Sequence, residues 1–398
     1  MNANDTATIQ SGELGLSEAA GEHAARVHEH LGALIAAEGG SISFERYMQE
    51  ALYAPGLGYY SGGAIKLGAD GDFITAPEVS RLFGACLAVQ CAEILKPLNE
   101  GVILEIGAGT GRLAVDVLSR LDGLHQLPRE YLILEVSADL RERQKKLIEQ
   151  SVPQLIERVR WLDAPPRESF EGILIANEVL DALPVARFRV EEQGLKEFYV
   201  RLQDERFQWV LQPARAALKE AYAKLEEAGC GFSAGYESEC CLRLEALTFS
   251  LTQSLAKGAA LFIDYGLPRA QYYLPERDRG TLMCHFRHRA HPDPLICPGL
   301  QDITAWVDFT RLAEASRAAG FELAGFTTQA HFLAGCGIDN EMRRLAGDNH
   351  NVFARLASQA RQLMLPGEMG ERFKAMAWLK GLELALCGFA VRDLRHSL

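Results

Sequence analysis

A run of glycines at residues 107–111 has the composition of a ligand-binding turn. The segment reads Glu105-Ile106-Gly107-Ala108-Gly109-Thr110-Gly111, and its first two residues end the short apolar run 102–106. Glycines allow the tight backbone angles of a strand-to-helix turn and let a ligand pack directly on the main chain. The helix that follows would offer unpaired N–H groups at its first turn. The pattern predicts a nucleotide-like cofactor, although an ordinary tight turn would show it too.

The spacing of the glycines separates three classes of cofactor. A dinucleotide fingerprint needs a third glycine at position 112, where this chain has Arg112. A phosphate-binding P-loop needs a Gly-Lys-Ser/Thr sequence that does not follow here. An acid two residues before the first glycine is the remaining pattern, and enzymes that use S-adenosylmethionine have it. In such enzymes Glu105 would pair with the cationic amino group of the cofactor, directly or through water.

Two further acids follow neighbouring strands of the predicted sheet. Glu135 ends the second strand, where a carboxylate can accept both ribose hydroxyls. This acid does not decide between cofactors, because dinucleotide folds place one similarly. Asp163 follows the third strand and could accept a hydrogen bond from the adenine amino group. A solvated loop acid is the alternative for Asp163.

Alternating apolar strands and helices position these residues. We predict strands at 102–106, 131–136, 159–162, 172–176, 259–264, 321–326 and 373–379, and helices at 112–121, 138–149 and 309–319. This alternation is typical of an α/β fold whose parallel sheet is covered on both faces.

The remaining regions surround this core. Helical periodicity covers 22–38, and Ser43 is a predicted N-cap for a helix over 46–52. The predicted organisation is a frayed tail at 1–20, a helical cofactor-lid region at 21–98, the core at 99–266, a substrate-side insertion at 267–308 and a C-terminal part that completes the sheet at 309–398. The insertion contains His285, Arg287, His288, Arg289 and His291, which we interpret as a solvated basic loop or a clamp for an acidic protein.

The composition argues against several classes of function. The net charge is −12 at pH 7, whereas nucleic acid and anionic membranes favour a cationic surface. The nine cysteines form no Cys-x-x-Cys pair, which predicts reduced thiols and gives no zinc signature. The first 25 residues contain no Lys or Arg, so they fit neither a secretory signal nor a transit peptide. We therefore expect a cytoplasmic protein with no metal, nucleic-acid or membrane partner.

Several separated motifs make the chain similar to a known family. Over roughly residues 40–385 it resembles the MidA-like methyltransferases, which include a mitochondrial complex I assembly factor that methylates an arginine. The order of the motifs along one chain is specific, although each motif alone is weak. They are Tyr47-Met48, Pro55-Gly56-Leu57-Gly58-Tyr59-Tyr60, 71–78, 105–111, 177–184, Asp264-Tyr265-Gly266, Gly280-Thr281-Leu282 and 298–304.

The resemblance implies a class I methyltransferase (Rossmann-like) sheet, bound S-adenosyl-L-methionine and a protein arginine as the acceptor. A respiratory-complex subunit is the kind of protein substrate it implies, and a homodimer is compatible with it. It also implies that the loop 71–78 lies over the cofactor, with Phe73, Thr75 and Pro77 as contacts.

An arginine acceptor requires carboxylates, because the guanidinium is always protonated at neutral pH. Asn177, Glu178 and Asp181 follow the fourth strand, at the edge where open α/β sheets bind ligands. In a helical turn Glu178 and Asp181 would face the same side, bracket the guanidinium and accept its proton. The alternative is that one of these acids caps a helix.

Three other functions compete with protein-arginine methylation. The same cofactor could serve the methylation of a small molecule. The chain could also be an assembly chaperone with an inherited methyltransferase fold, which the intact glycines and Glu105 disfavour. Arg112 argues against a nicotinamide dehydrogenase, because it stands where the dinucleotide fingerprint needs its third glycine.

Overall fold

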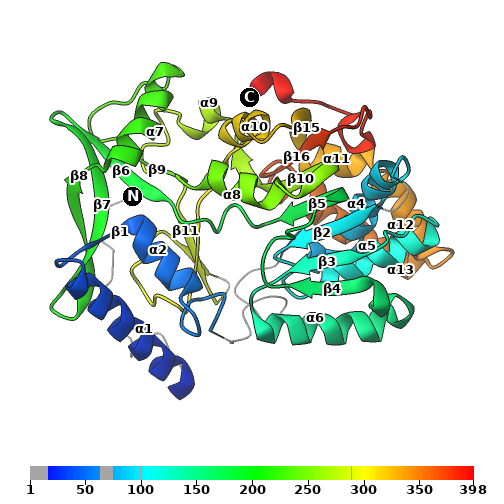
Figure 1. Cartoon of the computed structure of the whole chain (residues 1–398), viewed down its shortest axis with the longest axis horizontal. Helices are drawn as coiled ribbons and strands as arrows, with labels where there is room; N and C mark the ends of the chain where they lie inside the picture. Colours follow the sequence, from blue (N-terminus) through cyan, green and yellow to red (C-terminus); the bar gives the residue numbers. More distant parts are fainter. Residues whose placement is uncertain (1–16, 63–74, 99–100, 288) are drawn as a thin grey trace. The chain divides into compact units, whose positions relative to one another are not determined.

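The computed structural model describes residues 17–62, 75–98, 101–287 and 289–398, and it divides into two compact units (Figure 1). Unit 1 comprises Met1–Lys66, Pro184–Leu242 and Pro275–Ala305. Unit 2 comprises Leu67–Leu183, Arg243–Leu274 and Trp306–Leu398. Within the described ranges, no helix is both long and apolar enough to cross a bilayer.

Unit 2 contains a mostly parallel sheet in the order β15-β16-β10-β5-β2-β3-β4. Strands β2, β3, β4, β5 and β10 are parallel, and β16 runs antiparallel to both β10 and β15. Every residue of β2 is buried, as expected for a parallel strand covered on both faces. The strands are β2 (Val102–Ile106), β3 (Tyr131–Leu134), β4 (Val159–Leu162), β5 (Phe170–Asn177), β10 (Leu255–Leu267), β14 (Val307–Asp308, paired with β10), β15 (Glu322–Thr328) and β16 (Phe373–Lys380).

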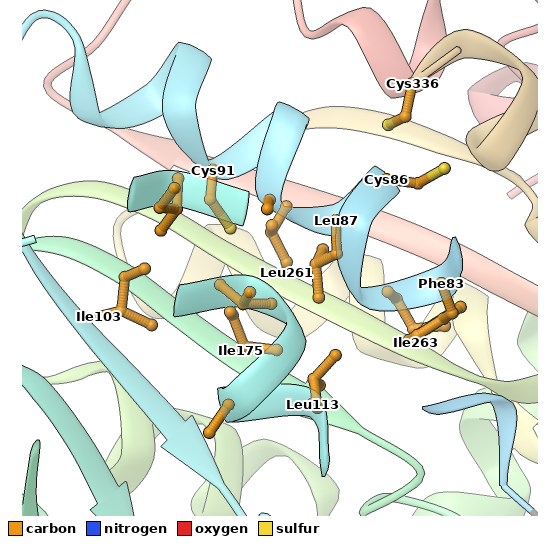
Figure 2. Close-up of a cluster of buried hydrophobic side chains, with 14 of the residues drawn as sticks. Phe83, Cys86, Leu87, Cys91, Ile103, Leu113, Ile175, Leu261, Ile263 and Cys336 are labelled. Atoms are coloured by element: carbon orange, nitrogen blue, oxygen red, sulfur yellow. The ribbon is translucent and has the colours of Figure 1, made fainter. Parts of the chain in front are cut away.

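Helices of unit 2 pack on this sheet through an apolar cluster (Figure 2). Phe83 and Leu87 of the fourth helix lie with Ile175 of β5 and Leu261 of β10 in this cluster, and Cys86 fills space as a small apolar side chain. The helices are α3 (Ala76–Val79), α4 (Arg81–Leu95), α5 (Arg112–Gly123), α6 (Ala138–Ser151), η1 (Pro153–Arg158), α8 (Leu244–Thr252), α9 (Arg269–Tyr272), α10 (Phe309–Ala318), α11 (Gln329–Gly335), α12 (Ile338–Ala346), α13 (His350–Met364), η2 (Cys387–Phe389) and η3 (Arg395–Ser397).

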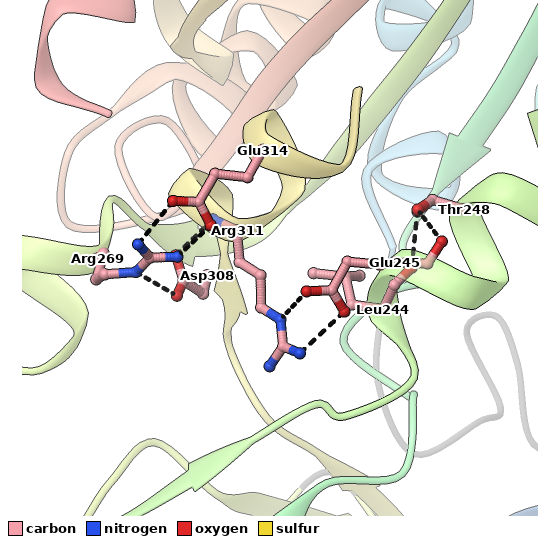
Figure 3. A network of polar contacts seen from close by, with 7 residues as sticks. All are labelled: Leu244, Glu245, Thr248, Arg269, Asp308, Arg311 and Glu314. Atoms are coloured by element: carbon pink, nitrogen blue, oxygen red, sulfur yellow. Dashed lines mark hydrogen bonds and ion pairs between the residues drawn. The ribbon is translucent and has the colours of Figure 1, made fainter. Parts of the chain in front are cut away.

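Ion pairs connect α8, α9 and α10 on one side of unit 2 (Figure 3). Asp308 caps α10 by accepting a hydrogen bond from the N–H of Arg311 at 3.0 Å, and it pairs with Arg269 at 3.4 Å. Arg311 pairs in turn with Glu245 at 2.8 Å. These contacts hold α8, which precedes β10, together with α9 and α10, which follow β10 and β14.

Unit 1 is built from antiparallel strands and helices. One sheet has the order β1-β7-β6-β9 with β8 paired to β7, and a smaller sheet has the order β12-β11-β13. The elements are α1 (Glu18–Ala37), β1 (Ile42–Ser43), α2 (Phe44–Tyr53), β6 (Ala186–Glu191), β7 (Gly194–Gln203), β8 (Arg206–Pro213), α7 (Ala216–Glu227), β9 (Glu237–Cys240), β11 (Met283–Phe286), β12 (Arg289–His291) and β13 (Asp302–Thr304).

Most predicted elements are confirmed, and three expectations are not. The strands at 102–106 and 159–162 match in full, and Ser43 caps α2 by accepting from the N–H of Arg46. However, 186–213 forms three antiparallel strands in unit 1 rather than part of the core, because these strands pair with β1 and β9. The basic stretch 285–291 in the insertion, for which a loop is one interpretation, lies mostly in the paired strands β11 and β12. Helix α1 begins at Glu18, capped by Ser17, inside the predicted tail.

Candidate functional site

The glycine turn at 107–111 has the left-handed backbone that its sequence predicts. Gly107, Gly109 and Gly111 have φ values of 63°, 54° and 88°. Gly111 is also the N-cap of α5, and a Cβ on it would lie 3.2 Å from Cα of Gln144. Side chains are strained at such φ values, so glycine is needed here on conformational grounds alone.

Glu105 lies at the end of β2 and is 2% exposed. It accepts a hydrogen bond from the hydroxyl of Tyr131 at 2.7 Å. The pKa of Glu105 is raised to about 7, because burial and the nearby Glu135 raise it by more than the hydrogen bond from Tyr131 lowers it. Within the described ranges Glu105 has this hydroxyl partner but no cationic one. A buried acid that lacks a counter-charge fits the ammonium group of a ligand bound on the glycine turn.

Glu135 is connected to the glycine turn by a residue that the sequence analysis missed. Glu135 is buried and accepts hydrogen bonds from the N–H of Ser137 at 2.8 Å and from Gln144 at 3.3 Å. Gln144 also donates to the carbonyl of Gly109 at 2.9 Å and accepts from the indole of Trp161 at 2.8 Å. Its amide therefore links the ends of β2, β3 and β4. No motif marks Gln144, because its role depends on which loops meet α6.

Asp163 lies after β4 with its side chain 89% exposed and ion-paired to Arg141. Arg141 also donates to the carbonyl oxygens of Glu135 and Leu162, at 2.6 and 2.9 Å. Val136 lies beside this cluster and is 77% exposed. An exposed apolar side chain next to two strand-end acids can provide a stacking surface for a flat ring. Val136 is not among the predicted site residues, and the signal for it in the sequence is an apolar residue directly after Glu135.

The helix α3 lies against the glycine turn. Thr75 is its N-cap, and Pro77 lies buried in its first turn. The hydroxyl of Thr110 donates to Glu78 of this helix. Phe73, the third predicted contact from this loop, lies outside the described residues. The helix that contains Pro77 and is capped by Thr75 therefore lies beside the glycine turn, and the contacts of Thr75 and Pro77 with a cofactor stay predictions.

Residues 177–181 form an extended turn, so the predicted helical turn is wrong. Asn177 ends β5, and Glu178 has a φ of 53°, a left-handed conformation that no helix contains. Three successive N–H groups, those of Val179, Leu180 and Asp181, donate instead to a single oxygen of Asp264. This carboxyl group replaces the carbonyl acceptors of a helix. Glu178 and Asp181 therefore do not share a helix face, and neither caps a helix.

Two buried oxygen atoms of this turn lack hydrogen-bond partners in the described part of the chain. They are Oδ1 of Asn177 and Oδ1 of Asp181. Burial raises the pKa of Asp181 to about 6, while Tyr265 and backbone N–H groups lower it. Unpartnered acceptors at a strand end are costly unless a ligand supplies donors. They suit a cation with several N–H groups.

The glycine turn and the 177–181 turn lie side by side. Strand β2 pairs with β5 in parallel, with Ile106 opposite Ala176, so both turns leave the same edge of the sheet. A Cβ on Gly107 would lie 3.4 Å from Cγ2 of Val179. The N–H of Ala76, at the start of α3, donates to Glu178 at 3.1 Å. One site therefore combines all three segments.

The His/Arg-rich stretch lies in unit 1, mostly in the β11–β12 hairpin. His288 lies outside the described residues. Among the residues with described positions, no three His, Cys, Asp or Glu side chains gather as a metal site would require.

Comparisons with known proteins agree in one family. A family model for S-adenosyl-L-methionine-dependent methyltransferases matches residues 86–327. The Danio rerio protein arginine methyltransferase NDUFAF7, mitochondrial, is 31% identical, covering 90% of this chain and 87% of its own length. The Homo sapiens protein of that name is 31% identical, with 85% and 80% covered. A crystal structure from Burkholderia thailandensis, bound to S-adenosyl-homocysteine, has 43% identity and a TM-score of 0.91, covering 96% of this chain and 99% of that one.

The prediction of a cytoplasmic protein is wrong, because these curated relatives are named as mitochondrial proteins. It rested on the charge of the first residues and on cysteine usage. Neither property decides in which compartment a folded enzyme works.

Proposed function

The chain belongs to the MidA-like family of S-adenosyl-L-methionine-dependent methyltransferases, and we propose that it methylates an arginine side chain of a protein. When bound, the cofactor supplies a methyl group activated by its sulfonium. The relatives named as protein arginine methyltransferases support this choice of acceptor. A respiratory-complex subunit as the substrate and a homodimer stay predictions.

The single observation that carries the proposal is the contact between the two turns. Val179 lies against Gly107, so the 177–181 turn lies next to the position where the glycine turn would hold the cofactor. The turn presents Asn177, Glu178 and Asp181, with two buried acceptor oxygens among them. A guanidinium is a planar fork of N–H donors that carboxylates hold best through paired hydrogen bonds.

Different residues of unit 2 would bind different parts of the cofactor. Glu105 would hold the amino group of the cofactor, and the glycine turn would carry its backbone contacts. Glu135 would accept the ribose hydroxyls, with Val136 and Asp163 beside the adenine. Thr75 and Pro77 would cover the cofactor from α3. Each role is a proposal that a structure with the bound cofactor would test.

Methylation of a guanidinium releases one proton, since the N–H bond is replaced by an N–CH3 bond. Glu178 and Asn177 would orient the guanidinium so that one nitrogen points towards the cofactor. Asp181 would accept the released proton at its carboxylate. Its raised pKa of about 6 makes it a better base than an exposed aspartate while leaving it ionised at pH 7.

Labelling with methyl-tritiated cofactor tests the proposal. The purified chain is incubated with a lysate of cells that lack it, and labelled protein is hydrolysed to amino acids. We expect the label in methylarginine. Glu178→Gln should lower the label by up to about a hundredfold, whereas Glu322→Gln, an exposed change on β15, should leave it unchanged. Label in lysine, or only in small molecules, would contradict an arginine acceptor.

A further inference from the structure

We propose that Asp264 is a positioning residue that fixes the conformation of the 177–181 turn for the acceptor. This role rests on the proposed function. In it, Asp264 brings Asn177, Glu178 and Asp181 together around the acceptor. Asp264 would touch neither cofactor nor acceptor, and it would act through the turn.

Asp264 makes an unusual set of contacts. Its Oδ2 accepts hydrogen bonds from the N–H groups of Val179, Leu180 and Asp181, at 3.2, 2.8 and 3.3 Å. Its Oδ1 accepts from the N–H of Tyr265 at 2.9 Å. One side chain on β10 thus satisfies three successive backbone donors from a segment more than eighty residues earlier in the chain. Without it, these donors would have to find other acceptors in a buried region.

The turn also contains a strained residue that needs such support. Glu178 has a φ of 53°, a conformation that disfavours side chains with a Cβ. The N–H of Glu178 donates to the carbonyl of Ile263, next to Asp264, at 2.8 Å. The bonds to Ile263 and Asp264 together hold the backbone at the strained residue and at the three residues that follow it. Strain maintained by surrounding contacts is a frequent property of functional sites.

The surroundings of Asp264 disfavour an ionised carboxyl group. An acid is therefore a poor choice at this position if its side chain only fills space. Asp264 is 1% exposed, and burial raises its pKa, with Asp181 and Glu178 adding repulsion. Lys374 is its cross-strand neighbour on β16, but the ammonium of Lys374 donates to the carbonyls of Glu371 and Arg372. Asp264 and Asp181 are two buried acids with no cationic partner among the described residues, which favours a functional reason for Asp264.

Three variants of the full-length chain test this role. Asp264→Ala removes the acceptor oxygen. Asp264→Asn keeps one oxygen, which can still accept the three N–H bonds of residues 179–181, although its NH2 group cannot replace the acceptor of the Tyr265 N–H. Asp308→Ala is the matched control, because Asp308 is also a buried aspartate that accepts a backbone N–H, at the start of α10.

Amide hydrogen exchange is the direct readout. We expect Asp264→Ala to raise exchange at Val179, Leu180 and Asp181 at least about tenfold, since each amide loses its acceptor. Asp264→Asn should stay within about threefold of the wild type, and Asp308→Ala should leave these amides protected. Calorimetry should give an S-adenosylmethionine Kd within about threefold of the wild type for all three variants. Methylarginine formation should fall roughly a hundredfold in Asp264→Ala, mainly in kcat, and recover in Asp264→Asn.

Two results would overturn the role of Asp264. One is unchanged protection of residues 179–181 in Asp264→Ala. The other is an equal loss of cofactor binding and methylation in that variant, which would indicate general damage. If the wild type forms no methylarginine while Asp264→Ala still exposes the three amides, the positioning role stands and the arginine acceptor is wrong.

Discussion

The glycine turn and the 177–181 turn lie next to each other but are maintained in different ways. The glycine turn is specified by its own residues, because Gly107, Gly109 and Gly111 all adopt positive φ values that glycine favours. The 177–181 turn contains Glu178 in a similar conformation without a glycine. Its backbone is held by Asp264, which arrives from a distant strand.

The two turns can therefore contact their ligands in different ways. A turn made of glycines can bring a ligand close to the main chain, and a bulkier residue removes both the conformation and the space. A turn held by a distant carboxyl group can present side chains such as Glu178, which a glycine could not do. The cofactor side therefore uses backbone, and the acceptor side uses side chains.

The largest effect is expected from Gly109→Val. A β-branched residue is strained at a φ of 54°, and its side chain would occupy space at the turn. We expect the affinity for S-adenosylmethionine in calorimetry to fall by about a hundredfold or more. Gly320→Val is the matched control, because Gly320 has a φ of 76° with open space around it. The Gly320→Val variant should have a similar backbone strain and keep its affinity for the cofactor. If Gly109→Val still binds the cofactor with normal affinity, the glycine turn is not the cofactor site.

Replacing Glu178 should separate acceptor chemistry from stability. Both Glu178→Ala and Glu178→Gly should lower methylarginine formation by roughly a hundredfold, with cofactor affinity retained. Glycine adopts a φ of 53° without strain, so Glu178→Gly should be more stable than Glu178→Ala by about 1 kcal/mol in thermal or chemical unfolding. Equal stability of the two variants would mean that the strain at Glu178 is negligible.

The raised pKa of Glu105 makes cofactor binding depend on pH. If the ionised carboxyl group holds the ammonium, affinity should rise about tenfold between pH 6 and pH 8, through the pKa of about 7. Without cofactor the sign for stability is opposite. The folded state binds a proton that the unfolded state releases above about pH 4.5, so stability falls as pH rises towards 7.

Calorimetry on Glu105→Gln at the same pH values provides the control, because it retains the titration of the ligand itself. Among the described residues, the titratable side chains that face Glu105 are those of Tyr131, Glu135 and Cys91. A wild-type affinity that follows the same pH course as Glu105→Gln would remove Glu105 from the binding of the ammonium group.

The smallest effect is expected from Gln144→Ala. Loss of the amide frees the carbonyl of Gly109 and the indole of Trp161, which should weaken cofactor binding about three- to tenfold and cost about 1–3 kcal/mol of stability. Gln329→Ala is a suitable control, since Gln329 is equally buried and donates to the carbonyl of Leu363. It should lose similar stability and keep its affinity. Equal effects of both variants on affinity would show that Gln144 does not support the cofactor side in particular.

Much of unit 2 could be predicted from local patterns. Buried parallel strands read as apolar runs, which is why 102–106 is predicted in full. The strand 159–162 is also predicted with its correct bounds, although it contains the exposed Arg160 and is a weaker apolar pattern. The strands β6, β7 and β8 were missed, because half-exposed antiparallel strands carry a weaker pattern. The helical turn expected at 177–181 failed because the spacing of Glu178 and Asp181 contains no information about Asp264.

The sequence alone determined the α/β sheet, the glycine turn and the acid that precedes it, because φ preference and apolar periodicity are local properties. The tertiary structure decided the remainder of the site. Gln144 gains its role where α6 meets the ends of three strands, and Asp264 gains its role where β10 lies beside β5. Both roles depend on hydrogen-bond partners that are far apart in the chain, and the parallel order of the sheet brings those partners together.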